Sequence, residues 1–370
     1  MSYEGYVHLG YKPKNDLVCT FRIEPSTDQA REAVAAESSI GTWKEVATMT
    51  PRIKKMGAKV FWVKGNNFKI AYPSELFEPG NMPQIFSSVA GNIFNMKEVK
   101  NLRLEDIEFP IGIEKSFPGP KHGIAGVRKI LHVPKRPLCG TIIKPKLGLD
   151  SANHARVAYE AWAGGLDIVK DDENLSSQKF NPFARRLDLT FKSLRKAEKE
   201  TGEKKAYMPN VTAETKEMLK RAKMVKEHGG THVMVDVVTC GFSAVQTLRE
   251  ETNLIIHGHR AMHGAFTRNP KHGISMLPYG KALKLVGVDQ LHVGTAVGKM
   301  EETKEQVVAV ARAIRPVFPV CSGGLEARHV MPLVKMLGRD IIIQAGGGIH
   351  GYPGGTRAGA AAMRKAVENV

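Results

Sequence analysis

A lysine stands close to two carboxylates in the segment GGLDIVKDDENLSSQ, residues 164–178. Lys170 comes two residues before Asp172 and three before Glu173, at the end of a predicted buried strand. Mg2+ takes six oxygen ligands and commonly combines carboxylates with waters or substrate oxygens. An uncharged lysine amine can add CO2 and become a carbamate, which would supply a third anionic oxygen. These residue types therefore favour a magnesium site, with an internal salt bridge and a solvated loop as alternatives.

A pair of lysines, Lys144 and Lys146, lies in GTIIKPKLGL, residues 140–149. Because they are two residues apart, the two side chains would share one side of a strand. Neighbouring cations lower each other's pKa, which suits an amine that transfers protons. The charged edge of a surface strand is the alternative interpretation.

Three histidines and an arginine gather in IIHGHRAMHGAF, which contains His257, His259, Arg260 and His263. An HxH pair in a barrel can mark a metal-dependent amidohydrolase. That class usually carries the pair on its first strand, whereas this pair lies on the fifth predicted strand. Packed or hydrogen-bonded histidines are the alternative. The guanidinium fork of an arginine also suits a phosphate dianion.

Glycine-bounded loops follow the last three predicted strands. QLHVGTAVGKM places His292 at a strand end and Lys299 on the loop after it, although a loop lysine alone is usually just exposed. SGG (322–324) and QAGGGIHG (344–351) follow the next two strands, and glycine lets backbone N–H groups approach a phosphate. The last string also matches GxGxxG. No second strand with a distant acidic residue follows it, so we do not expect a dinucleotide site.

These residues need a scaffold that brings strand ends together. From about residue 139 onward, short apolar runs alternate with amphipathic stretches. The predicted strands are residues 140–144, 167–170, 206–211, 232–237, 254–259, 290–294, 317–321 and 341–344. Eight strands alternating with eight helical patterns predict an α/β fold with a (β/α)8 TIM barrel, and an open doubly wound sheet is the alternative. The polar residues stand at the carboxyl ends of the strands, where a barrel carries its active site, which favours the barrel.

Residues 1–112 show a different pattern. Strand-like runs (LVCTFRIEP, KVFWVKG, FKIAYP) mix with helical segments (DQAREAVAAES, GNMPQIFSSVAGNIF). They predict a small N-terminal α+β domain of ferredoxin-like type, with one antiparallel sheet and helices on one face. The string SFPGPKHG predicts a linker, and we expect a linker with a lead-in helix at 113–138. The catalytic barrel domain is expected at 139–370.

The composition, with 42% apolar and 25% charged residues, is that of a globular protein. The sequence has no apolar run that could span a bilayer, no signal peptide at its start, and four scattered cysteines that fit a reducing cytosol. The net charge of +17 would suit nucleic-acid binding, but lysines alternate with glutamates as on a solvated helix. We therefore expect a cytoplasmic protein with neither nucleic-acid nor membrane partners.

The strings around Lys144, Lys170, His259 and Lys299 are long and occur in one characteristic order. They resemble the large-subunit family of ribulose-1,5-bisphosphate carboxylase/oxygenase (RuBisCO), most of all its archaeal form III branch. The resemblance implies a TIM-barrel enzyme of the carboxy-lyase class. Such an enzyme converts ribulose 1,5-bisphosphate, CO2 and water to two 3-phosphoglycerates through a Mg2+-bound enediolate, with O2 competing in an oxygenase reaction.

The resemblance also implies roles for the matching barrel residues. Lys170, converted by an activating CO2 to N6-carboxylysine, would bind Mg2+ with Asp172 and Glu173. Lys144 would protonate a late intermediate, and Lys299 would stabilise the new carboxylate when its loop closes. The expected substrate-binding residues are Lys146 beside the metal centre, His259 at the substrate hydroxyls, Arg260 and His292 at one phosphate, and Ser322, Gly323, Gly324, Gly346 and Gly347 at the other.

Four residues of the N-terminal region extend the resemblance: Glu37, Thr42 and Trp43 in AAESSIGTW, and Asn92 in GNIF. By residue type alone, Trp43 would pack in a core and Asn92 would occupy a turn. In RuBisCO the matching residues reach the active site of a partner subunit, which implies a homodimer with shared sites. Glu37 would pair with Lys299 on closure. Larger assemblies are compatible with this arrangement, and no small subunit is expected.

Two other functions remain as alternatives. A RuBisCO-like enolase or isomerase would enolise a related sugar phosphate without fixing CO2, although such proteins change several positions that this chain retains. A non-catalytic basic protein would bind polyanions with a steep salt dependence.

The chain departs from the best-known RuBisCO members at Met300, where they have leucine, and in the short segment after Lys299. These departures bear on loop closure and on the preference for CO2 over O2.

Overall fold

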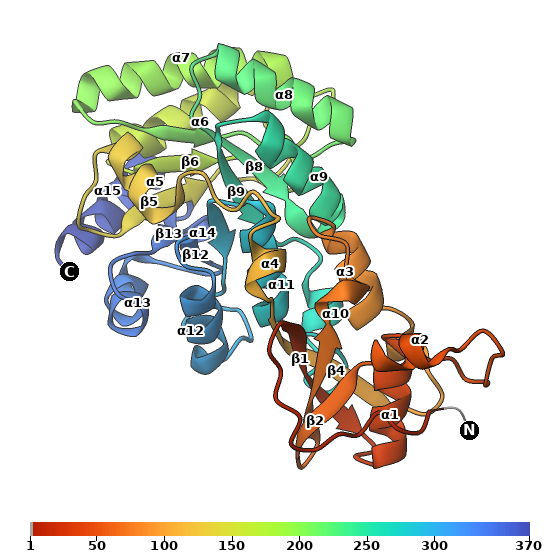
Figure 1. Cartoon of the computed structure of the whole chain (residues 1–370). Coiled ribbons are helices and arrows are strands. Elements are labelled where there is room, and N and C mark those ends of the chain that lie inside the picture. Colours follow the sequence, from red (N-terminus) through yellow and green to blue (C-terminus); the bar gives the residue numbers. More distant parts are fainter. Residues whose placement is uncertain (1–2) are drawn as a thin grey trace. The chain divides into compact units, whose positions relative to one another are not determined.

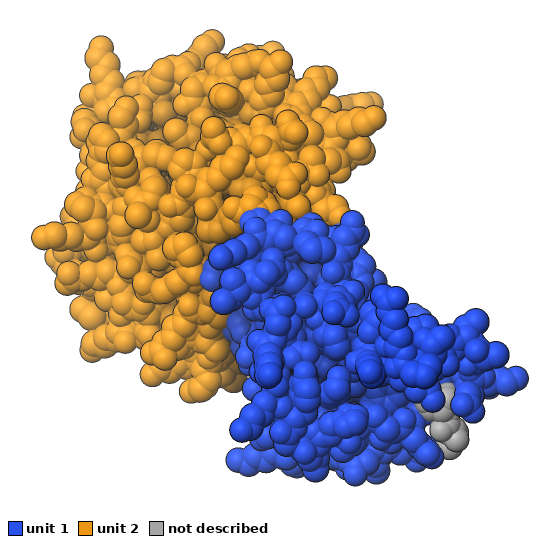
Figure 2. Space-filling model, viewed as in Figure 1, with its two compact units in different colours: residues 1–117, 262–285 blue, residues 118–261, 286–370 orange. Residues whose placement is uncertain are grey.

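The computed structural model describes residues 3–370, which form two compact units (Figure 2). Unit 1 comprises residues 1–117 and 262–285, and unit 2 comprises residues 118–261 and 286–370. A segment from the middle of the predicted barrel region therefore belongs to unit 1.

Unit 2 is built on parallel strands that curl into a barrel (Figure 1). Within the described residues its eight strands are β5 (Leu138–Ile142), β6 (Ile168–Lys170), β7 (Ala206–Met208), β8 (His232–Asp236), β9 (Ile255–His259), β11 (Gln290–His292), β12 (Phe318–Ser322) and β13 (Ile342–Gln344). Hydrogen bonds join them in the order β7-β6-β5-β13-β12-β11-β9-β8. A parallel bridge between Asn210 and Met234 links the two end strands, so the barrel is nearly closed. The predicted (β/α)8 barrel is confirmed.

Helices alternate with these strands (Figure 1). They are α5 (Gly123–Leu131), α6 (Ser151–Ala163), α7 (Phe183–Thr201), α8 (Thr215–Glu227), α9 (Val237–Glu251), α12 (Lys304–Ala313), α13 (Val330–Leu337), α14 (Gly347–His350) and α15 (Gly355–Glu368). Helix α7 buries Leu187 and Phe191, while Lys192 and Lys196 are exposed on its solvated side. Among the described residues, no helix is both long and apolar enough to cross a membrane.

The lead-in helix α5 fills the amino end of the barrel. Its residues Val127 and Leu131 belong to one buried apolar cluster with Ile168, Met234 and Phe318 of the strands. Removing this apolar surface from water is the main force that holds the helix there. The opposite end, where the strands finish, is left to carry polar residues.

The first barrel strand ends two residues earlier than expected. β5 stops at Ile142, and Lys144 and Lys146 lie in the connection after it, on either side of Pro145. The expected placement of both lysines on one side of a strand is therefore wrong. Proline has no N–H to donate to a sheet ladder, so the strand cannot continue through residue 145 as part of the barrel interior.

Unit 1 contains a mixed sheet (Figure 1). The elements of the unit are β1 (Asp16–Glu24), α1 (Asp28–Glu37), α2 (Pro51–Lys55), β2 (Lys59–Lys64), β3 (Asn67–Pro73), α3 (Met82–Val89), β4 (Asn101–Glu108), α4 (Ile111–Glu114), α10 (Gly264–Thr267), β10 (Gly273–Ile274) and α11 (Met276–Val286). In the described residues the sheet order is β10-β4-β1-β3-β2, and β1 to β4 pair antiparallel in a β-α-β-β-α-β succession.

The expectation of a purely antiparallel sheet is wrong because of β10. This strand comes from the segment 262–285 and pairs parallel with β4 at the edge of the sheet. Its two residues are too few to show a periodicity, so no sequence pattern marks it as a strand.

Candidate active site

Lys170 is the last residue of β6, and its side chain is fully buried. Its Nζ donates to the backbone oxygen of Asp171 at 2.9 Å and lies 3.8 Å from Glu173 Oε2. Burial lowers the pKa of the Lys170 amine, and the charges of Glu173 and Asp172 oppose this shift only in part. The structure therefore holds an amine that loses its proton more readily than an exposed lysine does.

The two adjacent aspartates have different surroundings. Asp171 Oδ2 accepts from Arg186 Nε at 3.1 Å, and Asp171 Oδ1 accepts from Tyr207 OH at 2.7 Å, in a fully buried network. Burial acts to raise the Asp171 pKa, but the Arg186 charge and the hydrogen bonds outweigh it and hold that pKa well below its usual range. Asp171 is thus committed to the packing behind β6, whereas Asp172 and Glu173 stand beside Lys170.

Lys144 and Lys146 reach the β6 connection from the neighbouring strand. Lys144 Nζ donates to Asp172 Oδ2 at 2.5 Å, and Lys146 Nζ donates to Asn174 Oδ1 at 3.1 Å. A Cβ atom added at Gly346, which follows β13, would come within 3.0 Å of Lys144 Cε. The missing side chain at Gly346 therefore leaves room for Lys144 to lie beside Asp172.

Asp172 and Glu173 are carboxylates of the kind that binds Mg2+, but two carboxylates alone do not complete a site. Among the residues that the structure describes, no three His, Cys, Asp or Glu side chains gather as a site that could hold a metal ion. Two carboxylates beside a buried amine of lowered pKa fit Mg2+ if Lys170 is carbamylated, because the carbamate supplies the third anionic oxygen. The residues present thus fit the expected magnesium ion on the condition of that modification.

His259 ends β9 between two carboxylates. Its Nδ1 lies 3.1 Å from Asp236 Oδ1, and its Nε2 lies 3.6 Å from Glu173 Oε2. Asp236 ends the adjacent strand β8. The backbone N–H of Ala261 also donates to Nδ1, at 3.2 Å, so two neighbours of this atom fix the orientation of the ring. The other ring nitrogen therefore faces the group around Lys170.

His292, at the end of β11, stands in a chain of hydrogen bonds. Its Nε2 lies 2.9 Å from His257 Nε2, its Nδ1 lies 2.8 Å from Ser322 Oγ, and His257 Nδ1 lies 2.8 Å from Gln290 Oε1. Since an amide oxygen only accepts, His257 carries its proton on Nδ1 and accepts from His292 Nε2, so His292 Nδ1 accepts from the Ser322 hydroxyl. Burial lowers the pKa of His292 well below its usual value. Ser322 therefore belongs to the histidine side of the site.

Arg260 follows β9 and is only 5% exposed. Its Nη2 donates to Glu302 Oε1 at 2.5 Å. Burial lowers the pKa of Arg260, and the Glu302 charge opposes this. After burial and the neighbouring histidines, the charge of Arg260 is among the causes that lower the pKa of His292, so the two expected phosphate ligands lie near each other.

Lys299 is exposed on the connection between β11 and α12. Its backbone N–H donates to Gly323 O at 3.1 Å. A Cβ atom at Gly323 would come within 2.5 Å of Met300 Cγ, and one at Gly324 within 3.0 Å of Lys299 Cγ. Gly323 also has a φ of 119°, which a residue with a side chain rarely adopts. Because Gly323 and Gly324 have no side chains, the segment with Lys299 can pack directly against their backbone. This role is separate from their expected contact with a phosphate.

Three of the residues expected from the N-terminal region have clear surroundings in unit 1. Glu37 ends α1 and accepts from Tyr3 OH at 2.6 Å. Asn92 is exposed at the start of a 3-10 turn, Asn92–Asn95. Trp43 is 71% exposed, so the alternative that it packs in a core is wrong. These residues belong to a different unit from Lys170.

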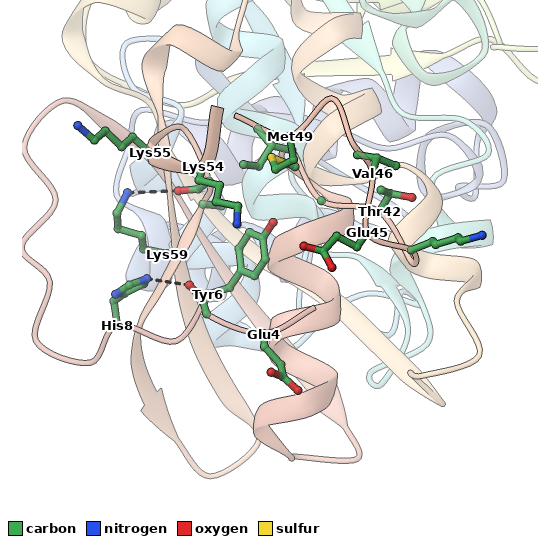
Figure 3. Close-up of a pocket in the computed structure, with 16 residues that line it drawn as sticks. Glu4, Tyr6, His8, Thr42, Glu45, Val46, Met49, Lys54, Lys55 and Lys59 are labelled. Carbon is green, nitrogen blue, oxygen red and sulfur yellow. Dashed lines mark hydrogen bonds between the residues drawn. The ribbon is translucent and has the colours of Figure 1, made fainter. Parts of the chain in front are cut away.

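Thr42 lines a hollow of about 620 Å3 in unit 1 (Figure 3). Lys54, Lys55 and Lys59 also line it, and Tyr6 lies among them in Figure 3. Thr42 therefore has basic and aromatic side chains around it.

Family models match almost the whole chain. The model described as ribulose bisphosphate carboxylase large chain, N-terminal domain, matches residues 5–113. The model of the catalytic domain of the same large chain matches residues 123–315 and 310–370. The chain belongs to the RuBisCO large-chain family. Members of this family are enzymes, so the expectation of an enzyme is confirmed.

Curated RuBisCO relatives from archaea are similar over more than nine-tenths of their length. The ribulose bisphosphate carboxylase of Methanocaldococcus jannaschii is 49% identical over 399 residues, covering 99% of this chain and 94% of the relative. That of Methanosarcina mazei is 48% identical over 396 residues, covering 98% and 92%. The predicted resemblance to the archaeal branch is confirmed, and the names of these relatives do not favour the enolase alternative.

Solved RuBisCO structures share the fold. The octameric ribulose-1,5-bisphosphate carboxylase/oxygenase of Pyrococcus horikoshii OT3, in complex with sulfate, has a TM-score of 0.95 and 45% identity over 100% of this chain and 91% of its own. The dimeric archaeal Rubisco of Hyperthermus butylicus has a TM-score of 0.92 and 42% identity over 99% and 93%. This fold therefore occurs in both dimers and octamers.

Three residues of the candidate site were not predicted from the sequence. Asp236 carries a usable signal, since it stands at the carboxyl end of a predicted strand as the other site residues do. Gln290 begins β11, and at the amino end of a barrel strand we expect a polar residue to contribute to stability. Its contact with His257 is visible only in the structure. Glu302 lies in the charged string MEETKE, where nothing distinguishes it from Glu301.

Proposed function

We propose that this chain carboxylates ribulose 1,5-bisphosphate with CO2 and water to two 3-phosphoglycerates. The observation that carries the proposal is the buried Lys170 amine, whose pKa is lowered by burial and which stands 3.8 Å from Glu173 and next to Asp172 at the strand end. The names of the archaeal relatives support the same reaction. O2 would compete with CO2 for the same enediolate of the substrate.

Activation is the first step of the proposal. The neutral Nζ of Lys170 attacks CO2, a C–N bond forms, and the nitrogen loses a proton to leave a carbamate anion. Mg2+ bound by this carbamate with Asp172 and Glu173 would act as a Lewis acid on substrate oxygens. Lys144, which donates to Asp172 at 2.5 Å, stands beside these ligands. The carbamate would take the C3 proton, and the Lys144 ammonium would deliver the last proton.

The remaining barrel residues would bind and orient an extended bisphosphate. Arg260 and His292 would hold one phosphate, and the contact with His292 favours placing Ser322 there rather than with the glycines, where the sequence placed it. The backbone around Gly323, Gly324, Gly346 and Gly347 would hold the other. His259, oriented by Asp236, would contact the substrate hydroxyls, Lys146 would stand beside the metal centre, and Lys299 would stabilise the new carboxylate.

The N-terminal residues Glu37, Thr42, Trp43 and Asn92 would complete the site of a partner chain in a homodimer. An indole that is 71% exposed supports this, because tryptophan is enriched at interfaces and seldom left so exposed. Mixing a Trp43→Ala chain with a Lys170→Met chain would then restore part of the activity, because one site of each mixed dimer has every residue. Two inactive variants that stay inactive after subunit exchange would exclude shared sites.

The proposal also includes a domain division and a cellular location. The domain division is 1–112 for the N-terminal α+β domain, 113–138 for the linker with α5, and 139–370 for the catalytic barrel. The enzyme would work in the cytoplasm without a small subunit, with further assembly of dimers left open by the dimeric and octameric structures of relatives.

The test is incorporation of labelled CO2 into acid-stable product by the purified protein with Mg2+ and ribulose 1,5-bisphosphate. Lys170→Met should abolish label in 3-phosphoglycerate, whereas the control Lys179→Met, at an exposed lysine nine residues away, should keep it. Absence of label in the wild-type protein, together with proton exchange at C3 of the sugar, would instead show an enolase.

A further inference from the structure

We propose that Glu302 is an internal competitor of the substrate phosphate for Arg260, and that a phosphate which displaces it releases the segment carrying Lys299. The inference rests on the proposed function and deepens it. Glu302 lies on the same connection as Lys299, three residues further along, and its role would be to position that connection before substrate binds.

The contact between Arg260 and Glu302 is buried, but only one of its two possible hydrogen bonds is formed. The side chains are 6% and 18% exposed, and one pair of atoms, Arg260 Nη2 and Glu302 Oε1, is in contact at 2.5 Å. The other two atoms, Arg260 Nη1 and Glu302 Oε2, are buried without a hydrogen-bond partner in the described part of the chain. A guanidinium usually holds a carboxylate through two parallel bonds. A buried donor is thus left unsatisfied, which costs free energy that a better acceptor would recover.

A phosphate is such an acceptor. Its oxygens can accept from both guanidinium nitrogens at once, whereas Glu302 engages only one. The Arg260 charge is also felt by His292, whose Nδ1 accepts from the Ser322 hydroxyl, so the exchange takes place at the polar end of the neighbouring strands. Exchange of Glu302 for a phosphate therefore replaces one anion by another and keeps the buried charge of Arg260 compensated throughout.

Glu302 also anchors the segment that carries Lys299. Helix α12 begins two residues after Glu302 with a capping box formed by Thr303 and Gln306, so the chain is fixed on that side. On the other side, the backbone N–H of Lys299 is bound to Gly323 O. Between β11 and α12 the ion pair at Glu302 therefore ties the end of the connection to Arg260, near the expected phosphate position.

The same connection holds a strained backbone. Ala296 has a φ of 55°, in the left-handed region that residues with a side chain rarely adopt. Such a conformation persists where surrounding contacts hold it. Loss of the Glu302 contact removes the ion pair that holds the far end of this connection, so phosphate binding at Arg260 would favour a different arrangement of residues 294–302.

The first test is the binding of inorganic phosphate, measured by titration calorimetry. Glu302→Gln removes the competing charge but keeps the side-chain size, and it should bind phosphate about 10-fold more tightly than wild type, since no bound conformer has to be displaced. The matched control Glu301→Gln removes the same charge from the exposed neighbouring residue and should leave the affinity unchanged. In an Arg260→Gln background, the Glu302 substitution should have no effect.

The second test uses the wild-type protein and so does not depend on the folding of a variant. Hydrogen exchange of the amides of residues 299–302 should become faster when inorganic phosphate is added. For the variants, the KM for ribulose 1,5-bisphosphate should fall in Glu302→Gln and stay the same in Glu301→Gln.

Phosphate affinity that is equal or weaker in Glu302→Gln, or exchange that is unchanged or slowed by phosphate, would overturn the inference. The two proposals fail separately. Tighter phosphate binding by Glu302→Gln in a protein that fixes no CO2 would refute the proposed function alone. Normal CO2 fixation with no effect of Glu302→Gln on phosphate binding would refute only the role of Glu302.

Discussion

Strands β6 and β11 each carry charged or titratable side chains at both ends, and the two ends differ in kind. Asp167 and Asp289 stand immediately before the strands, while Lys170 and His292 end them. Asp289 accepts four hydrogen bonds, from Arg249 Nη1 and from the backbone N–H groups of residues 122, 123 and 256.

The amino ends are occupied by closed ion pairs. Arg136 holds Asp167 through two contacts of 2.7 Å, and Arg249 and Asp289 are both fully buried at 2.7 Å. At the carboxyl ends, Lys170 has no paired carboxylate within 3.5 Å, and Arg260 is only half paired. The difference teaches that the buried charges before these strands are closed into ion pairs, whereas after the strands only Asp171 is closed in this way and other polar groups stay available for a ligand.

Substitutions at Lys170 and at Asp289 test this comparison most strongly, because one should affect activity and the other stability. Lys170→Met should lower carboxylation by well over the ~100-fold typical of a residue that only orients a ligand. Its free energy of unfolding should equal or exceed that of wild type, because a buried lysine is replaced by an apolar side chain of similar length. Carboxylation assays and urea denaturation measure the two effects. A Lys170→Met variant that is both inactive and strongly destabilised would contradict the difference between the two ends of the strands.

Asp289→Asn should show the opposite pattern. It leaves Arg249 as a buried charge without its carboxylate, which should lower the free energy of unfolding by about 3–5 kcal/mol. Carboxylation per folded molecule, measured at a temperature where the variant is folded, should stay near the wild-type value. The control Glu368→Gln removes an exposed partner of Arg364, and it should change stability by less than about 0.5 kcal/mol.

The pH dependence of stability tests a buried group at the amino end of a third strand. His232 begins β8, and burial lowers its pKa to about 3. An unfolded histidine binds a proton below about pH 6.5. Between these two pKa values the unfolded state holds the extra proton, so stability is full above about pH 6.5 and falls as pH drops toward 3, by up to ~1.4 kcal/mol per pH unit.

His232→Asn should therefore flatten the acid limb of a stability curve measured by urea denaturation between pH 4 and 8. The same variant at pH 8 serves as the reference, because no histidine contributes there. An acid limb as steep as that of wild type would show that His232 is not buried in its neutral form.

Much of this architecture could be predicted from the sequence, because strand runs and glycine-ended helices alternate in a regular way. The chemistry-bearing residues Lys170, His259 and His292 could be predicted from their places at strand ends. The strand end before Lys144 was missed because an apolar run continues to Ile143, whereas Pro145 decides the conformation. β10 and the contact of Glu302 with Arg260 were missed because both depend on tertiary proximity, which leaves no periodic pattern.

The spacing of residues in the sequence also could not show which of Asp171 and Asp172 faces the site. Both are acidic and adjacent, and the identity of their partners decides their roles. Arg186 and Tyr207 take Asp171 into the packing behind the barrel, while Lys144 meets Asp172 at the site. Alternation along the chain predicts that neighbours point to opposite sides, but only the positions of these partners show which side carries the chemistry.

The central claim is that Lys170 is the carbamylated residue, and trapping the carbamate tests it most directly. The wild-type protein would be incubated with CO2 and Mg2+, treated with an alkylating reagent that locks a carbamate as an ester, digested, and analysed by mass spectrometry. We predict the added mass on the peptide with Lys170, dependent on CO2 and absent from the peptides with Lys144 and Lys146. An unmodified Lys170 in a preparation that fixes CO2, or the modification on Lys144 instead, would contradict the account.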